Sequence, residues 1–182
     1  MDLRRGLLLF AVLCILTTAV KAESPADTAG GVADVEYSDL YGLFQLMIPS
    51  GWIYQAGESS ACLLVFYGPE HEQLLYIEYF PELTFTDPME FAASVLNHYG
   101  AAYGLNGFEL ISGPTLIDLA GLKAAQVEYN YVGKKEWTEC RIFAIIDQMG
   151  LTITFSEASE YYSDSKAQFD SILASLSWEV SK

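Results

Sequence analysis

Few side chains in this 182-residue sequence have the types and spacing that chemistry requires. His71 lies between Glu70 and Glu72, which are residue types that bind divalent cations. Neighbouring side chains on an extended loop diverge, however, and a metal site needs further ligands from elsewhere in the chain. We therefore expect a solvated loop here and no metal site. The second histidine, His98, lies near the end of a predicted helix, where a cation is favourable against the helix dipole.

Catalytic motifs are missing from the sequence. It contains no GxSxG, HExxH, phosphate-loop or EF-hand pattern. Carboxylate pairs such as Glu157 and Glu160 occur as often as chance would place them in so acidic a chain. General acid–base catalysis needs two carboxylates held in a cleft with separated pKa values, and spacing alone does not provide that. We expect a protein that is not an enzyme and binds no cofactor.

Two cysteines, Cys62 and Cys140, follow the N-terminal segment, and both fall within predicted strands. In an exported chain they could oxidise to a disulfide. They could equally remain two separate buried thiols, because cysteine is among the most buried residue types. Both interpretations stay open at the level of the sequence.

The first 22 residues predict a secretory signal peptide. A short basic start is followed by an uncharged apolar stretch over residues 6–20, and Val20-Lys21-Ala22 places small residues at the −3 and −1 positions of a cleavage site. We expect cleavage after Ala22, with Ala19 as a second candidate. The apolar stretch is short for a membrane span. The expected location is therefore secreted or periplasmic, without a stable membrane span after cleavage; an uncleaved N-terminal membrane anchor is the alternative.

The chain is strongly acidic, with a formal net charge of −15. The signal peptide holds three basic residues and one acidic residue, so the chain that remains after cleavage carries −17. Such a surface repels nucleic acid and anionic lipid, and we expect no nucleic-acid partner. Because the acidic residues are scattered along the chain, solubility is the simplest reason for them. A divalent cation or a basic partner is the alternative.

Residues 23–36 are small and polar and predict a flexible linker, and residues 37–182 predict one domain. Strands are expected at residues 41–48, 52–54, 62–67, 74–80 and 108–119. Asp87 can cap a helix and Pro88 suits its first position, which predicts a helix over about residues 88–99. Gly100 should end that helix in the left-handed conformation.

Residues 123–155 predict a meander of three strands. Gly133-Lys134 suits a two-residue hairpin loop, which would place Val127 opposite Cys140. A second turn over residues 147–150 would place Ile146 opposite Leu151. One face of the meander would then be apolar, made of Ala125, Val127, Cys140, Ile142, Ala144, Ile146, Leu151, Ile153 and Phe155.

The opposite face of the meander is mixed. Its expected polar members are Gln126, Glu128, Glu139, Arg141, Thr152 and Thr154. It also presents Trp137, Phe143 and Ile145. These three side chains could be covered by the N-terminal segment or by a loop, or they could form a surface for a protein partner.

The C-terminal helix is expected over about residues 164–176, with Ser163 or Asp164 as its N-cap. Phe169, Ile172, Leu173 and Leu176 recur at helical spacing and predict a stripe that packs on the sheet. The predicted fold class is α+β: an antiparallel sheet of six to eight strands, with the internal and C-terminal helices packed on it.

Three segments carry a family resemblance: residues 44–52, which end in IPSGW, residues 121–129, and residues 169–178, FDSILASLSW. Over about residues 41–178 the chain resembles the PsbP-like superfamily, which includes the photosystem II extrinsic protein, DcrB-type exported proteins and Ran-binding Mog proteins. The resemblance implies an antiparallel sheet covered by helices and, for many members, a non-enzymatic role in a larger assembly.

No residue by which photosystem members bind metal finds a match in this chain. The signal peptide, the fold resemblance and the absence of catalytic motifs together predict an exported binding or assembly-accessory protein of the cell envelope that acts through a protein partner. A small-molecule or divalent-cation binder is the alternative.

Overall fold

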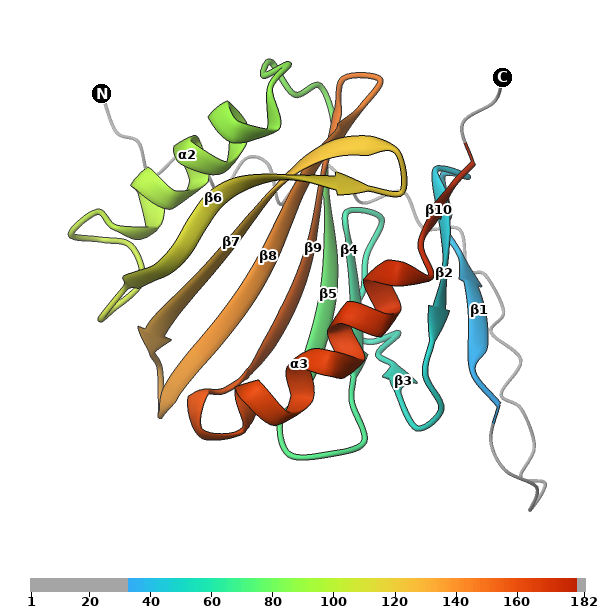
Figure 1. Ribbon diagram of the computed structural model, residues 1–182, viewed down its shortest axis with the longest axis horizontal. Helices are drawn as coiled ribbons and strands as arrows, with labels where there is room; N and C mark the ends of the chain where they lie inside the picture. Colours follow the sequence, from blue (N-terminus) through green and yellow to red (C-terminus); the bar gives the residue numbers. More distant parts are fainter. Residues whose placement is uncertain (1–32, 180–182) are drawn as a thin grey trace.

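The computed structural model describes residues 33–179 (Figure 1). A seven-stranded antiparallel sheet has the order β3-β4-β5-β9-β8-β7-β6, and a small sheet has the order β1-β2-β10. The strands are β1 (Val35–Ser38), β2 (Phe44–Ile48), β3 (Ile53–Tyr54), β4 (Leu63–Tyr67), β5 (Leu74–Phe80), β6 (Glu109–Leu119), β7 (Leu122–Val132), β8 (Glu136–Ile146), β9 (Met149–Ala158) and β10 (Ser177–Trp178). The helices are α2 (Pro88–Tyr99) and α3 (Ser159–Ala174). This arrangement confirms the expected α+β class.

The predicted signal peptide, its cleavage after Ala22 and most of the linker lie outside the described residues. Strand β1 begins at Val35, inside the segment expected to be linker. Between residues 33 and 179, no helix is long and apolar enough to cross a membrane.

Helix α2 begins where the sequence predicts. The Asp87 side chain accepts a hydrogen bond from the Met89 backbone N at 2.8 Å, and Pro88 occupies the first helical position. The helix ends at Gly100, as expected, but this glycine has a φ of −78° and is right-handed. The left-handed stop was therefore wrong. The Gly100 backbone N still donates to Leu96 O at 2.9 Å, so the chain continues from the helix into a further turn.

Helix α3 begins at Ser159, several residues before the predicted caps Ser163 and Asp164. Ala158, at the N-cap, offers no side-chain cap. Two other hydrogen bonds take the place of the cap. The buried Glu157 side chain accepts from the adjacent Ala158 backbone N at 2.8 Å, and the Thr138 hydroxyl of β8 donates to Ser159 Oγ at 2.8 Å. These bonds fix the junction between strand and helix.

The expected pairing of β7 with β8 is wrong by one residue. Val127 pairs with Arg141, and Cys140 pairs with Glu128. The hairpin loop has three residues, 133–135, and the Gly133 backbone N donates to Lys135 O at 2.8 Å. A slip of one residue moves every side chain of a strand to the other face. Val127 and its alternating neighbours therefore lie opposite the face that carries Cys140.

The pairing of β8 with β9 differs by two residues, which preserves the faces. Ile146 pairs with Met149 across a two-residue turn. Asp147 and Gln148 form that turn at φ values of 46° and 69°, as primed hairpin turns require. The even-numbered residues of β8 therefore share a face with the odd-numbered residues of β9, as expected.

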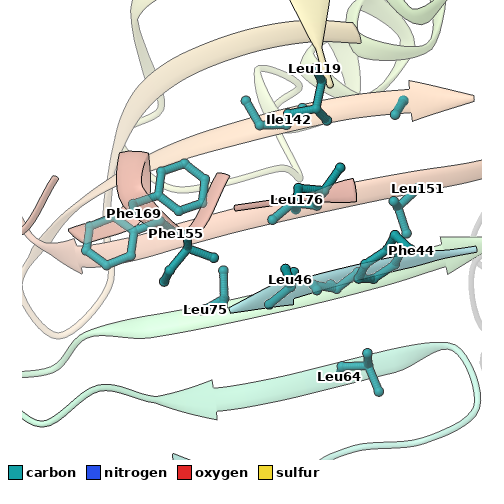
Figure 2. Close-up of a cluster of buried hydrophobic side chains, with 14 of the residues drawn as sticks. Phe44, Leu46, Leu64, Leu75, Leu119, Ile142, Leu151, Phe155, Phe169 and Leu176 are labelled. Atoms are coloured by element: carbon teal, nitrogen blue, oxygen red, sulfur yellow. The ribbon is translucent and has the colours of Figure 1, made fainter. Parts of the chain in front are cut away.

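The two faces of the large sheet are covered by different elements. On one face, α3 and the small sheet enclose the main apolar core; Figure 2 shows Phe155 of β9 beside Phe169 of α3, with ring centroids 5.4 Å apart. On the other face, α2 covers a second cluster that includes Phe91, Tyr129 and Phe143. Both faces of the central strands are thus buried: on β8, Ile142 belongs to the main core and Phe143 to the cluster under α2.

Candidate functional site

The three side chains predicted as a partner surface do not share one environment. Trp137, Phe143 and Ile145 lie on the same face of β8. The Phe143 ring is fully buried, 5.2 Å from the ring of Phe91 on α2, and Ile145 packs in the same cluster. Helix α2, rather than the N-terminal segment or a loop, covers both residues. Phe143 is therefore closed to a partner, whereas Trp137 and Ile145 are each partly exposed, and Ile145 packs against the cluster under α2.

Of the two interpretations left open for Cys62 and Cys140, the structure has two separate thiols and no bridge between them. Cys140 is a buried thiol whose Sγ accepts a hydrogen bond from Gln126 Nε2 at 3.3 Å, and burial raises its pKa to about 12. The Cys62 carbonyl accepts from the Tyr79 backbone N of β5, which places Cys62 beside the outer edge of that strand. Strands β5 and β9 lie between this position and β8. Three strand spacings amount to about 14 Å, twice the reach of a disulfide.

The loop that contains His71 is organised by stacking. The His71 and Tyr161 rings lie parallel, with centroids 3.8 Å apart. Its neighbour Glu72 forms an ion pair with Lys135, 2.5 Å from carboxylate to ammonium. Within residues 33–179, no group of three or more His, Cys, Asp or Glu side chains is placed to hold a metal ion.

Loops from distant parts of the chain meet around Trp137 and enclose a groove of about 620 Å³. We call it the Trp137 groove. Its lining residues are Tyr67, Gly68, His71, Glu72, Gln73, Leu74, Lys134, Lys135 and Trp137. The β4–β5 connection supplies one wall and the β7–β8 hairpin supplies the other. The Lys135 ammonium lies 5.2 Å from the centre of the Trp137 ring, so the groove combines an aromatic surface with a cation.

The sheet extends from this groove into a buried polar network. Pairing of Leu74 with Ser156, and of Ser156 with Glu139, puts these side chains on the face that also carries Trp137. Three tyrosine hydroxyls donate to the Glu139 carboxylate: Tyr76 at 3.0 Å, Tyr131 at 3.2 Å, and Tyr129. Burial raises the pKa of Glu139, although the hydroxyl donors act to lower it.

Arg141 forms the second half of this network. Its guanidinium forms an ion pair with Glu78, donates to Thr152 Oγ1 at 3.3 Å, and donates to the Tyr99 hydroxyl of α2. The rings of Tyr76, Tyr99 and Phe143 surround it, with centroids 5.5, 5.6 and 5.7 Å from its central carbon. Burial lowers the pKa of Arg141, and the ion pair with Glu78 balances its charge. The network thus ties α2 to strands β5, β8 and β9.

Sequence reasoning missed this network, although it left a signal. Glu139 and Arg141 are charged residues at alternate positions of a mostly apolar strand, and Glu139 pairs with Tyr129 of β7. Charged side chains are rarely buried unless they are paired. A strand that carries both signs on one face therefore predicts an internal network.

No protein-family model and no curated protein sequence matches this chain. Solved structures do match. The solution structure of the cyanobacterial PsbP (CyanoP) from Synechocystis sp. PCC 6803 aligns with a TM-score of 0.62 at 20% identity, over 85% of this chain and 98% of that one. The chain has the PsbP/Mog1-like fold. At this identity the likeness establishes the fold, and it confirms the resemblance expected from the sequence.

Two further structures with the PsbP/Mog1-like fold match nearly as well. LpqN of Mycobacterium tuberculosis aligns with a TM-score of 0.54 at 15% identity, over 82% of this chain and 92% of that one. The Ran-binding protein Mog1p of Saccharomyces cerevisiae aligns with a TM-score of 0.55 at 10% identity, over 81% of this chain and 96% of that one. On this scaffold, Glu139 and Arg141 lie on the same sheet face as Trp137, which lines the groove.

Proposed function

We propose that this chain is an exported, non-enzymatic accessory protein of the cell envelope that binds a protein partner in the Trp137 groove. The observation that carries the proposal is the groove itself. Trp137 is a large aromatic residue, partly exposed beside Tyr67, whose exposed fraction is 39%. Tryptophan and tyrosine in a preformed recess are typical anchors of protein interfaces.

The setting of the groove favours binding with little rearrangement. Behind Leu74 and Trp137, the side chains of Glu139 and Arg141 are held by several hydrogen bonds and an ion pair. A rigid wall loses little conformational entropy when a partner binds, and more of the contact energy then appears as affinity.

Proteins of similar fold support the envelope role. LpqN is described as involved in cell envelope biogenesis, and Mog1p as a Ran-binding protein. Those descriptions belong to those proteins. Together with the predicted signal peptide, they favour an exported binding protein over other functions for this chain.

Site-specific cross-linking in living cells tests the proposal. A photoreactive phenylalanine analogue replaces Tyr67 in the groove or, as the matched control, Leu116, a residue of strand β6 that is 54% exposed at the opposite edge of the sheet. We expect one dominant cross-linked protein from position 67 and none from position 116. We also expect Trp137→Glu to reduce the yield at least tenfold. Cross-links from position 116 alone, or none from position 67, would contradict the proposal.

A small-molecule ligand is the second candidate, because a groove of about 620 Å³ has the size of many ligand sites. A ligand that binds only the folded protein raises its melting temperature. Melts with a metabolite library and with Ca²⁺, Mn²⁺ and Zn²⁺ therefore address this candidate. It gains support if a compound stabilises the protein but not its Trp137→Ala variant, and it fails if no compound does.

A further inference from the structure

We propose that the partner segment entering the Trp137 groove is an acidic extended peptide, with a carboxylate side chain one or two positions from an apolar side chain. This inference rests on the proposed function, because it specifies the chemistry of the partner at the same groove. Its basis is the placement of the few basic side chains in a strongly acidic protein.

The described residues contain five basic side chains: Lys123, Lys134, Lys135, Arg141 and Lys166. Arg141 is buried and paired with Glu78, and Lys166 is paired with Asp170 at 2.8 Å. Within residues 33–179, only the β7–β8 hairpin brings two lysines together at the surface. Both of them, Lys134 and Lys135, line the groove.

These lysines can accept a carboxylate. Lys134 is exposed and forms no ion pair among the described residues. Lys135 pairs with Glu72, but the two side chains are 34% and 53% exposed. An exposed ion pair contributes only about 0–1 kcal/mol, so an incoming carboxylate can replace Glu72 at small cost.

The spacing within the groove sets the pattern of the peptide. The Lys135 ammonium lies 5.2 Å from the centre of the Trp137 ring. An extended peptide advances about 3.3 Å per residue. A carboxylate at the lysines and an apolar side chain on Trp137 therefore come from neighbouring positions or from positions two apart.

The negative charge of the rest of the protein makes the groove selective for an acidic peptide. With a net charge of −15, most of the surface repels an acidic segment and attracts a basic one. A basic partner would find many weak sites, whereas an acidic partner is favoured only beside the lysine pair. Screening over about 8 Å at physiological ionic strength allows this local attraction to act in spite of the overall charge. The groove thus accepts a ligand that the remaining surface rejects.

A display experiment tests the inference. Phage carrying random 12-residue peptides are selected on the full-length chain, and enriched peptides are then synthesised and measured by fluorescence polarisation. We expect enriched sequences with Asp or Glu within two positions of an aromatic or aliphatic residue. We expect Trp137→Ala to weaken binding at least tenfold, and the pair Lys134→Gln with Lys135→Gln to do the same. The pair Lys123→Gln with Lys166→Gln removes equal charge elsewhere and should change affinity less than twofold.

The outcomes separate this inference from the proposed function. Peptides that depend on Trp137 but are basic or uncharged would overturn the acidic chemistry while leaving the groove as the partner site. Equal losses from the two lysine pairs would also overturn it, because the effect would then come from net charge. If no peptide is enriched, or if binding ignores Trp137, both the acidic peptide and the groove as a peptide site fail.

Discussion

The two faces of the seven-stranded sheet are buried by different chemistry. Beneath α3 and the small sheet, the core is made of aliphatic and aromatic side chains such as Phe155, Phe169 and Leu75. Beneath and beside α2, the same strands present Glu139 and Arg141 among tyrosines and threonines. One sheet thus carries an apolar core on one side and, on the other, a hydrogen-bonded network beside a second, smaller apolar cluster.

The two faces contribute differently: apolar burial stabilises the fold, and the polar network fixes the positions of its side chains. Apolar burial is the main favourable term in folding, and it is largely non-directional. Buried polar groups contribute little net free energy once their desolvation is counted, but they fix the positions of their partners. The network lies on the sheet face that also carries Trp137, so its hydrogen bonds position the strands beside the groove. Substitutions on the two faces should therefore differ in size and kind.

The largest effect is expected on the apolar face. Phe155→Ala should lower the free energy of unfolding by about 3–5 kcal/mol, because it removes a fully buried ring and leaves a cavity against Phe169. Urea denaturation measures this loss. Ile53→Ala, at a side chain 63% exposed, is the matched control and should change stability by less than about 0.5 kcal/mol. Similar decreases in the free energy of unfolding for the two variants would contradict the assignment of Phe155 to the core and Ile53 to the surface.

A substitution on the polar face should lower stability less, and a second substitution should restore much of the lost stability. Arg141→Met is expected to lower the free energy of unfolding by about 3 kcal/mol, because it strands the Glu78 carboxylate and the Tyr99 hydroxyl. Adding Glu78→Met should restore much of that loss, since an apolar pair can replace a buried ion pair. A double-mutant cycle in urea measures the coupling. A double variant no more stable than Arg141→Met would show that the pair is not the source of the loss.

Glu139 should make the stability of the polar face depend on pH. Folding raises its pKa above the ordinary 4.5, so the folded protein keeps a proton that the unfolded chain has lost. That contribution is complete below about pH 4.5 and disappears as the pH rises through the folded-state pKa. In this window, the stability of the native protein relative to Glu139→Gln should fall by about 1.4 kcal/mol per pH unit. Denaturant titrations of both proteins measure it. If this relative stability instead rose with pH, the tyrosine hydroxyls would lower the pKa of Glu139 more than burial raises it.

The smallest effect concerns the thiols. Because Cys62 and Cys140 form no disulfide, a reductant should leave the melting temperature of the purified protein unchanged. Differential scanning calorimetry with and without dithiothreitol measures it, and Cys62→Ser serves as the control. A decrease in melting temperature on reduction, absent in that variant, would indicate a bridge and a different placement of these strands.

Local chemistry made some elements predictable. The start of α2 follows from the Asp87 cap and from Pro88, and β5 lies between a Gly-Pro loop and Pro81. The start of α3 did not follow from capping rules, because contacts of Glu157 and Thr138 with the strand–helix junction replace the cap. The Thr138 contact joins β8 to the start of α3 over 21 positions of the chain, and it has no local signature in the sequence.

The pairing of β7 with β8 was missed for a different reason. Register can be inferred from sequence when only one face of a strand is apolar. Here both faces of β8 are buried, so the apolar face of β7, with Ala125 and Val127, can pack on either side of the sheet, and it packs under α2. The sequence also identified Trp137 but grouped it with Phe143 and Ile145. Separating them required the position of α2, which depends on contacts between residues about fifty positions apart.

The groove could not be assembled from the sequence at all. Its walls come from residues 67–74 and 134–137, which meet because β9 lies between β5 and β8. That neighbourhood is set by the strand order of the whole sheet. The pattern of apolar and polar residues within either segment does not predict that the two segments meet.

The central claim is that Trp137 serves binding rather than stability. The most direct measurement compares the native protein with Trp137→Glu for two quantities: the free energy of unfolding in urea, and the cross-linking yield from position 67. We expect the free energy of unfolding to change by no more than about 1 kcal/mol, because the Trp137 side chain is partly exposed. We expect the cross-linked partner to be lost. If Trp137→Glu lowers the free energy of unfolding by several kcal/mol and also abolishes the cross-link, Trp137 is a core residue. If the cross-linking yield does not change, Trp137 is not part of the partner site.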